Sequence, residues 1–354
     1  MPLDTDLMIP LVEDRYPLTP LQQGMLFHSL DIPSFYLQQY LCRLEEPLDL
    51  DCFQAAWQRI LERYSILRTC FQWQDTEIAQ QIVYKHLQCP WHFEDWRHLN
   101  TEQQQQQLQE YLYADRQRGF ALDQAPLMRV AVFQWSETDY GFIWSNHHSI
   151  LDGRSRLLLF RELFTHYEAL RQHHDAELGP AYPYRDYVDW LKQQDFTQAE
   201  TFWRQQLQGL EAPTPLIDLQ ATPEQAQVHA QQELFLSQTL TQALQNLTQS
   251  LQITLNTVIQ GLWALLLSRY ARESTVAFGA TRACRYWTTQ DPQYRIGLFI
   301  NTVPMCVAVP TEMPAAEWLQ QLRQHWVAMR DYEHTPLALI QKWSPLGAQQ
   351  ALFD

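Results

Sequence analysis

The segment from Tyr140 to Gly153 constrains this chain more than any other part of its sequence. It follows a short polar turn and is rich in aromatic residues, which predicts the second strand of a hairpin whose first strand covers residues 127–135. It ends with two adjacent histidines and an Asp-Gly pair, which favours a sharp turn. A helix is predicted next, because large apolar residues recur at spacings of three and four from Leu157 to Tyr167. The histidines therefore lie where a strand gives way to a helix.

The two adjacent histidines, His147 and His148, cannot readily bind one metal ion together. Side chains alternate across a strand, so the two imidazoles point to opposite faces of the sheet. The sequence has no His-Glu-x-x-His pattern and no closely spaced cysteine pair to complete a metal site. We therefore predict no bound metal. One histidine is expected to face the interior of its lobe and the other to face a pocket.

Strand-like and helix-like segments occur together in both halves of the chain. In the first half, an apolar stripe that begins at Phe53 predicts a helix, with Asp51 as its N-cap. In the second half, another apolar helical stripe precedes strand-like segments at residues 275–281 and 296–309. Mixed elements in both halves predict an α/β or α+β fold.

The best candidate for a boundary is the polar stretch at residues 172–183, which contains turn residues and two prolines. A length of 354 residues also suggests two domains or one bilobal unit. We predict a two-lobed fold with an N-terminal lobe at residues 1–175, which carries the histidines, and a C-terminal lobe at residues 176–354.

Composition excludes several classes of function. The chain has 25 Lys and Arg against 40 Asp and Glu, and a net charge of −15 argues against binding to nucleic acid or to an anionic membrane. No apolar run approaches the length of a membrane span, and the acidic first residues do not resemble a signal peptide. The six cysteines are widely spaced, as in reduced cytosolic proteins. We therefore expect a cytoplasmic protein.

The string HHSILDG at residues 147–153 resembles the active-site motif of condensation domains of nonribosomal peptide synthetases, which belong to the chloramphenicol acetyltransferase-like superfamily. Five further segments resemble other motifs of that family and occur in the family's order. They are YPLTPLQQGMLFHSL (16–30), RYSILRTCF (63–71), YRDYVDWL (184–191), IGLFINTVP (296–304) and YEHTPLALI (332–340). Together the six segments span nearly the whole chain.

The resemblance implies both a fold and a reaction. The fold is a pseudo-dimer of two mixed-sheet lobes. The reaction is acyl transfer that forms an amide bond: the amine of a carrier-bound acceptor aminoacyl thioester attacks a carrier-bound donor aminoacyl or peptidyl thioester. The implied partners are donor and acceptor peptidyl carrier proteins and an adjoining adenylation domain. The chain itself is expected to bind no cofactor, because the carrier proteins deliver the phosphopantetheine arms.

The resemblance also implies roles for individual residues. His148 matches the histidine that faces the reaction centre, where it orients or deprotonates the amine or stabilises the tetrahedral state. Gly153 matches a position whose backbone N–H lies near the thioester carbonyl. His147 is expected to be structural, and Asp152 is expected to pair with an arginine. Arg285 is preferred as that partner because it lies 12 residues before Gly297 in the sequence, and Arg282 is the alternative.

Arg68 and Asn301 also match family motif positions, and bracing of the fold is the favoured interpretation for both. The chain departs from the family in having Ala283 and Cys284 before the arginine, where Ser-Gly is usual. It also ends at Asp354, where the family continues into another strand and a crossing segment, so the second lobe is expected to be truncated.

Two other functions stay open. One is a free-standing acyltransferase that uses small diffusible thioesters and the same histidine. The other is a truncated, inactive domain that only docks carrier proteins. Epimerisation domains are disfavoured because their glutamate-centred motif is not found, and heterocyclisation domains because they replace the histidines with aspartates.

Overall fold

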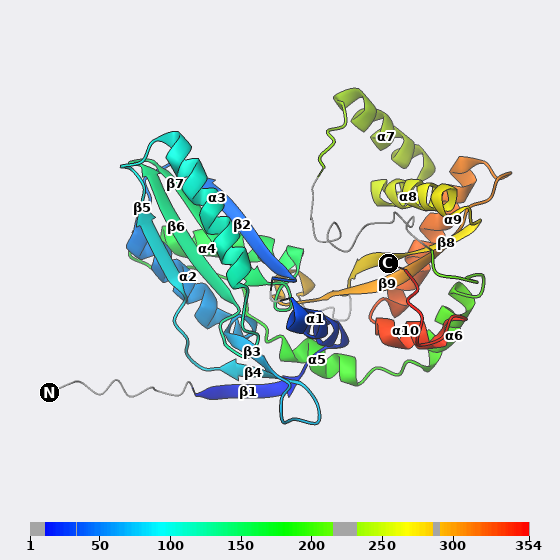
Figure 1. Ribbon diagram of the computed structural model, residues 1–354, viewed down its shortest axis with the longest axis horizontal. Helices are drawn as coiled ribbons and strands as arrows, with labels where there is room; N and C mark the ends of the chain where they lie inside the picture. The colour runs from blue at the N-terminus through cyan, green and yellow to red at the C-terminus, as the bar shows by residue number, and fades with distance from the viewer. Residues whose placement is uncertain (1–10, 33, 215–231, 286–290, 354) are drawn as a thin grey trace. The chain divides into compact units, whose positions relative to one another are not determined.

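The computed structural model describes residues 11–32, 34–214, 232–285 and 291–353. The chain divides into two compact units (Figure 1). The first comprises Met1–Gln194 with Arg285–Ile300, and the second comprises Asp195–Cys284 with Asn301–Asp354. Residues 1–10, on which the signal-peptide interpretation rests, lie outside the described residues.

The first unit extends past the predicted boundary at residue 175 and also includes a segment from much later in the chain. Residues 176–194 and 285–300 both bury apolar side chains in the core of this unit, and burial of apolar surface determines which parts of a chain pack together. These side chains are Tyr184, Tyr187 and Val188 in the earlier segment and Ile296, Leu298 and Phe299 in the later one. A boundary placed at a polar linker cannot show that a later segment of the chain packs back into the core of the first unit.

The larger sheet of the first unit is mixed and has four strands in the order β2-β7-β6-β5. Pairing is antiparallel between β2 and β7 and between β7 and β6, whereas β5 and β6 are parallel. The hairpin predicted from the sequence is therefore present as β6 and β7. The strands are β2 (Leu37–Leu44), β5 (Trp91–Asp95), β6 (Met128–Ser136) and β7 (Asp139–His147).

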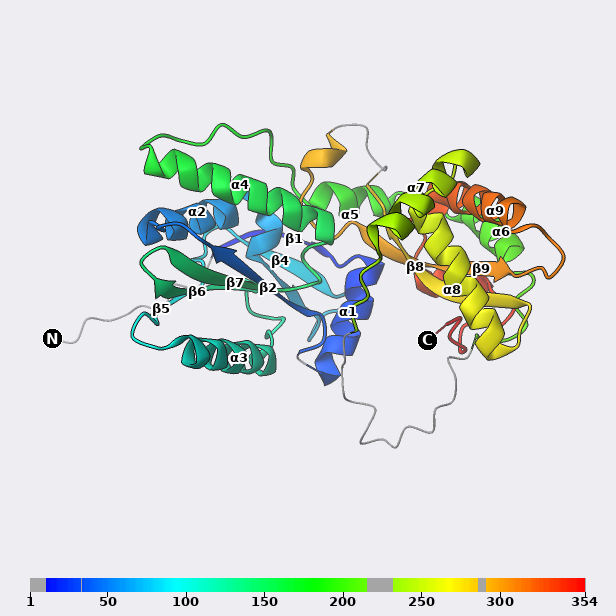
Figure 2. The same cartoon turned by 90° about the horizontal axis from the view of Figure 1, so that it is seen from above.

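Helices cover both faces of this sheet, with α2 (Leu50–Arg63) and α4 (Gly153–Arg171) on one face and α3 (Thr101–Arg118) on the other (Figure 2). The alternation of β7 separates the two layers. Phe142 and Trp144 pack with the core that includes α2 and α4, and Ile143 packs with the smaller cluster beneath α3. Successive side chains of β7 thus alternate between the two helical layers in the part of the strand that precedes the histidines.

The apolar stripe predicted on the first helix is confirmed, since Phe53 and Trp57 are fully buried in α2. The predicted N-cap is wrong. Asp49 caps α2, because its carboxylate accepts the backbone N–H of Cys52 at 3.0 Å, and Asp51 lies in the first turn.

A three-stranded antiparallel sheet completes the first unit, in the order β1-β4-β3. Two further helices and two short 3-10 helices lie in the same unit. The bounds are β1 (Val12–Pro17), β3 (Thr69–Gln72), β4 (Gln80–Tyr84), α1 (Pro20–Asp31), α5 (Arg185–Lys192), η1 (Ser65–Arg68) and η2 (Pro292–Tyr294).

The second unit has a two-stranded sheet, β8 (Thr275–Ala283) and β9 (Ile300–Ala308), with helices around it. The strand predicted from residue 296 begins only at Ile300. The preceding residues instead make backbone hydrogen bonds to the histidine loop of the first unit, as the next section describes. The helices are α6 (Thr197–Gln206), α7 (Gln238–Leu251), α8 (Leu255–Ala271), α9 (Ala315–Ala328), η3 (Met329–Tyr332) and α10 (Leu337–Trp343).

Helix α8 is apolar on two faces. Val258, Ala264 and Leu267 are buried in the core of the second unit, whereas Leu262 and Tyr270 are 56% and 59% exposed. Among the described residues, no single helix has the length and apolarity needed to cross a membrane, and α7 and α8 satisfy that test only as a pair bent by 101°.

Candidate active site

The histidines lie in a loop that the sheet and helix α4 hold at both ends. His147 is the last residue of β7, and its backbone N–H donates to the carbonyl of Leu127 at 3.0 Å. His148 leaves the strand, but its N–H still donates to the carbonyl of Tyr36 at 2.8 Å. A turn closes next, in which the N–H of Leu151 donates to the carbonyl of His148 at 3.4 Å. Only residues 148–152 separate β7 from α4, so the loop has little freedom.

His147 is fully buried, and both of its ring nitrogens have partners. Nδ1 accepts the backbone N–H of Ser149 at 3.3 Å and lies 2.6 Å from its hydroxyl. Nε2 lies 3.2 Å from the hydroxyl of Ser29, which itself donates to the carbonyl of Met25 at 2.7 Å. Nε2 therefore carries the ring proton. Burial lowers the pKa of His147 to about 4, so the ring is neutral near pH 7.

His148 is half-buried, and one hydrogen bond fixes its tautomer. Its Nδ1 lies 2.7 Å from the backbone carbonyl of Leu151. A carbonyl oxygen only accepts, so Nδ1 carries the proton and Nε2 of the neutral ring carries the lone pair. Within the described part of the chain, no group hydrogen-bonds this Nε2. The ring can therefore accept a proton at Nε2 while its other nitrogen stays anchored.

Asp152 is 2% exposed, and three different groups donate to its carboxylate. It is the N-cap of α4, and Oδ1 accepts the backbone N–H of Ser155 at 2.7 Å. One guanidinium nitrogen of Arg285 lies 2.6 Å from Oδ1 and 2.8 Å from Oδ2. The backbone N–H of Phe299 donates to Oδ2 at 3.0 Å. A buried carboxylate with this many donors is well satisfied.

The segment that contains Arg285 and Gly297 is also hydrogen-bonded to the start of α4. The backbone N–H of Asp152 donates to the carbonyl of Gly297 at 3.1 Å, and the hydroxyl of Ser155 donates to that carbonyl at 2.8 Å. A Cβ at Gly297 would lie 2.3 Å from a ring carbon of Tyr184, so only glycine allows this approach. Gly297 therefore lies against the start of α4 through its own backbone N–H and carbonyl.

Arg282, the alternative partner of Asp152, lies in the second unit and pairs with another carboxylate. Its guanidinium contacts Oε2 of Glu333 at 2.9 and 3.0 Å and lies 3.8 Å from the ring centroid of Trp326. Arg285 is the arginine that the structure brings to Asp152.

Gly153 is the first residue of α4 and is exposed. A Cβ added at this position would meet no atom within 4 Å. The cap of Asp152 uses the N–H of Ser155 and not that of Gly153. Backbone N–H groups in the first turn of a helix carry partial positive charge, so Gly153 presents a donor beside the histidine loop.

The hydrogen bonds of Arg68 and Asn301 are made to groups outside the histidine loop. Arg68 donates to the carbonyls of Leu61 and Tyr84 at 2.9 and 2.8 Å, and also to the carbonyl of Glu62, so it closes the C-terminal end of α2. Asn301 belongs to the second unit, where its side-chain amide donates to the carbonyls of Glu333 and Thr335 at 2.9 and 2.7 Å. Both side chains brace the chain around them.

The described residues contain no group of three or more His, Cys, Asp or Glu side chains that could hold a metal ion. The histidine loop is thus built from one anchored imidazole, one buried imidazole, a carboxylate that caps α4 and pairs with Arg285, and an exposed glycine at the start of that helix.

A protein-family model described as "Condensation domain" matches residues 12–354 of this chain. The chain belongs to the condensation-domain family. The family predicted from six sequence motifs is therefore confirmed.

Curated relatives of this condensation domain are much longer proteins. It is 40% identical over 346 residues to one component of the linear gramicidin synthase of Brevibacillus parabrevis, and this match covers 97% of this chain and 7% of that protein. It is 33% identical over 334 residues to surfactin synthase subunit 3 of Bacillus subtilis (strain 168), and this match covers 93% of this chain and 26% of that protein. The chain thus spans less than a tenth of the first relative and about a quarter of the second.

Solved structures establish the fold. The starter condensation domain of rhizomide synthetase RzmA superposes with a TM-score of 0.78 at 18% identity over 96% of this chain and 78% of that one. Holo-AB3403, a four-domain nonribosomal peptide synthetase, gives a TM-score of 0.75 at 18% identity over 96% of this chain and 26% of that one. The mixed, two-lobed α/β fold predicted from the sequence is confirmed, and the truncation of its second lobe stays a prediction.

Sequence analysis of the condensation domain missed several residues that hold its histidine loop: Gln22, Ser29, Ser149, Ser155 and Tyr184. A signal existed for the first of these. Thr19 and Gln22 form a capping box at the start of α1, and a threonine followed three residues later by glutamine before an apolar run is its pattern. The serines carry no such signal, because their partners are distant in the sequence.

Proposed function

We propose that this condensation domain forms an amide bond between a donor acyl group, held as a thioester, and the amine of an acceptor. The anchored tautomer of His148 carries the proposal. Its Nδ1 is committed to the carbonyl of Leu151 at 2.7 Å, which leaves Nε2 as the proton acceptor. Membership of the condensation-domain family supports the same reaction.

In the proposed reaction, the acceptor nitrogen attacks the thioester carbon and forms the C–N bond. His148 Nε2 takes a proton from that nitrogen. The tetrahedral state then collapses, the C–S bond breaks, and the thiolate leaves and takes up the proton from His148. A positioned general base contributes roughly 10²–10⁴-fold to such a step. Holding both reactants in one site supplies much of the remaining acceleration.

The oxygen of the tetrahedral state carries negative charge and needs a donor. The backbone N–H of Gly153 is the proposed donor, since Gly153 is an exposed residue at the start of α4 and its N–H is not used by the cap of Asp152. His147, Asp152 and Arg285 take no part in proton transfer in this scheme, because both ring nitrogens of His147 have partners and Asp152 and Arg285 are paired with each other.

The proposed substrates are attached to donor and acceptor peptidyl carrier proteins through phosphopantetheine, and an adenylation domain is the proposed neighbour. The relatives support this setting, since AB3403 is a four-domain nonribosomal peptide synthetase. The carrier proteins supply the phosphopantetheine thiol, so the domain needs no cofactor of its own. Action in the cytoplasm belongs to the same proposal.

A single-turnover transfer assay tests the proposal. The purified chain is mixed with one carrier loaded with a donor aminoacyl group and another loaded with an acceptor, and intact-protein mass spectrometry follows dipeptide on the acceptor carrier. We expect product, a loss of roughly 10²–10⁴-fold in rate for His148→Ala, and no change for His174→Ala, a matched control at an exposed histidine.

Three other results would contradict the proposal. Product that survives His148→Ala would remove the assigned base. Transfer from a small diffusible thioester at the rate seen with carriers would favour a free-standing acyltransferase. Carrier binding without product from any loaded pair would favour a docking domain.

Gly153→Ala tests the second role without disturbing the fold. The variant keeps the N–H, and its new Cβ meets no atom of the chain within 4 Å. A normally folded variant with slower transfer places the substrate next to this residue, and an unchanged rate argues against an oxyanion site there.

A further inference from the structure

We propose that Gln22, on α1, is a positioning residue for His148. It acts by holding the carbonyl of Ser149, the residue that follows His148 in the loop. This inference rests on the condensation activity proposed above, and it assigns a role to a residue that lies 126 positions earlier in the sequence.

The side-chain amide of Gln22 is fully buried, and its contacts fix its orientation. Oε1 accepts the backbone N–H of Thr19 at 2.9 Å, which only an oxygen can do. Nε2 donates to the carbonyl of Ser149 at 3.0 Å and to Oε1 of Gln81 at 3.1 Å. Each atom of the amide therefore has a defined partner, and the amide cannot be reversed without losing them.

Gln22 also connects the loop to the smaller sheet. Gln81 lies on β4 and is fully buried, and its own amide donates to the carbonyl of Pro17 at the end of β1 at 3.1 Å. One glutamine side chain thus joins the start of α1, the β1-β4-β3 sheet and the histidine loop. A network with every member satisfied is rigid, and it is costly to break at one point.

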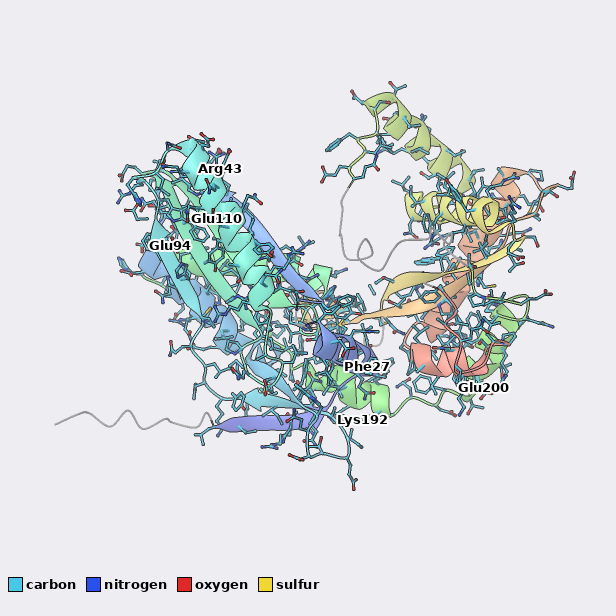
Figure 3. All side chains as sticks on the ribbon, in the orientation of Figure 1. Phe27, Arg43, Glu94, Glu110, Lys192 and Glu200 are labelled. Carbon is cyan, nitrogen blue, oxygen red and sulfur yellow. The ribbon has the colours of Figure 1, made fainter. Side chains whose placement is uncertain are left out.

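Helix α1 holds the loop at a second point, two turns further along. Ser29 lies seven residues after Gln22, on the same face of the helix. Its hydroxyl contacts Nε2 of His147 at 3.2 Å. The opposite face of α1 is exposed, as Phe27 shows with an exposure of 67% (Figure 3).

His148 therefore lies between two residues that α1 holds, with His147 before it and Ser149 after it. His147 and Ser149 are also joined to each other, since the hydroxyl of Ser149 lies 2.6 Å from Nδ1 of His147. The position of His148 relative to the sheet follows from α1 and not only from β7. A catalytic base must be placed within about 0.5 Å, and an error of about 1 Å costs roughly 10²-fold in rate.

Gln22→Glu is the sharpest test. The carboxylate keeps an oxygen for the N–H of Thr19, but it places a second oxygen against the carbonyl of Ser149, where a donor is needed. We expect transfer to slow by about 10–100-fold with the KM for the loaded carriers unchanged. Gln23→Glu makes the same change at the neighbouring exposed residue of α1 and should stay within about twofold of the parent.

Two further variants test the proposal in case Gln22→Glu does not fold. Gln22→Met has a similar length and lacks the amide, and Ser29→Ala removes the contact to His147. Both should slow transfer without raising KM, and circular dichroism should show parental secondary structure. A folded Gln22→Met with the parental rate overturns the proposal.

A double-mutant cycle separates positioning from a general loss of structure. If Gln22 acts through His148, Gln22→Glu should add little further loss once His148 is alanine. An equal loss in both backgrounds overturns the proposal, because the effect would then not pass through His148.

Failure of the proposed function would be seen separately, as no product from the parent chain. In that case the ring-nitrogen NMR signals of His148 still test the network. The parent should show a proton on Nδ1, and Gln22→Glu should shift that tautomer or broaden its signals, with Gln23→Glu unchanged. Identical His148 signals in all three proteins would overturn the role of Gln22.

Discussion

Two buried arginine–carboxylate pairs differ sharply, although their arginines lie only three residues apart in the sequence. In the first unit, Asp152 receives Arg285 and two backbone N–H groups. In the second unit, Oε2 of Glu333 receives Arg282, and burial raises the pKa of Glu333. Each of the two arginines has one buried guanidinium nitrogen without a partner among the described residues. Arg282 and Arg285 are equally buried, at 5% exposed each.

The difference shows what a buried ion pair contributes. The attraction within such a pair roughly balances the cost of removing both charges from water, so the pair alone is weak evidence for stability. Asp152 does more, because it also caps a helix and accepts the N–H of a distant segment. Asp152 therefore contributes to stability through the backbone groups that it holds in place. Glu333 has no comparable set of donors among the described residues.

Removal of the Asp152 carboxylate should have the largest effect. Asp152→Ala leaves Arg285 buried without its partner and removes the cap of α4, so we expect a loss of about 4–6 kcal/mol in the free energy of unfolding. Urea unfolding followed by circular dichroism measures it. A loss below about 1 kcal/mol would remove the distinction between the two pairs.

Acid should act in opposite directions on two buried groups, His147 of the first unit and Glu333 of the second. The folded pKa of His147 is about 4 against about 6.5 when unfolded, so below pH 6.5 the unfolded chain binds a proton that the folded chain does not. Stability from this group is complete above pH 6.5 and falls by about 3 kcal/mol as the pH drops to 4. The pKa of Glu333 is raised in the fold, so its own contribution to stability grows as the pH falls. His325 and His334 of the same unit act the other way, because burial lowers their pKa values.

Unfolding curves between pH 7 and pH 4 test this contrast. His147→Gln should flatten the pH dependence relative to the parent, and Glu333→Gln should steepen the loss. If His147→Gln leaves the slope unchanged, the buried imidazole is not the group that titrates.

Replacement of both members of a pair by apolar residues should change the free energy of unfolding differently at the two sites. Arg282→Met combined with Glu333→Leu removes both charges, and we expect a change within about 1 kcal/mol or a gain in stability. Arg285→Met combined with Asp152→Leu should instead destabilise the chain by several kcal/mol, since the N–H groups of Ser155 and Phe299 would be buried without an acceptor. Equal results for the two double variants would contradict the argument.

The surface of α8 provides the smallest expected effect on stability. The larger sheet of the first unit is covered on both faces, whereas α8 in the second unit exposes Leu262 on one face and buries Leu267 on another. Leu262→Gln should change the free energy of unfolding by less than about 0.5 kcal/mol, while light scattering at high concentration should fall because an exposed apolar patch shrinks.

Leu267→Gln is the matched control, and it should cost about 2–5 kcal/mol because it buries a polar group in the core. If Leu262→Gln were as destabilising as Leu267→Gln, the exposed face of α8 would have to be packed in solution.

Local features of the fold were predictable from the sequence. The β6-β7 hairpin and the helices α2, α4 and α8 follow from alternation or from spacings of three and four residues. The stripe predicted on α8 is not its buried face, since Leu262, Leu266 and Tyr270 are exposed. The strand that was predicted from residue 296 begins later, because the N–H of Phe299 and the carbonyl of Gly297 are bonded to Asp152. Local patterns cannot reveal a contact between residues that lie 147 positions apart.

The candidate site shows the same division. The histidines, Asp152 and Gly153 form one short string and could be identified together. The choice between Arg282 and Arg285 needed the structure, since both are arginines that flank the same short segment. Gln22 was visible only as part of a helix-start motif and Ser29 carried no signal, because their contacts to the loop depend on how α1 packs.

The pairing of Asp152 with Arg285 also determines when the histidine loop can be completed during synthesis of the chain. The two residues are separated by 133 positions, and a ribosome adding roughly 5–20 residues per second needs about 7–27 seconds to make that interval. During this time the histidine string has been synthesised but lacks the segment that pins it. The part of the second unit from Asp195 to Cys284 is synthesised before that segment. The histidine loop of a nascent chain is therefore completed late, after the strands and helices of the first unit that precede Arg285 have been synthesised.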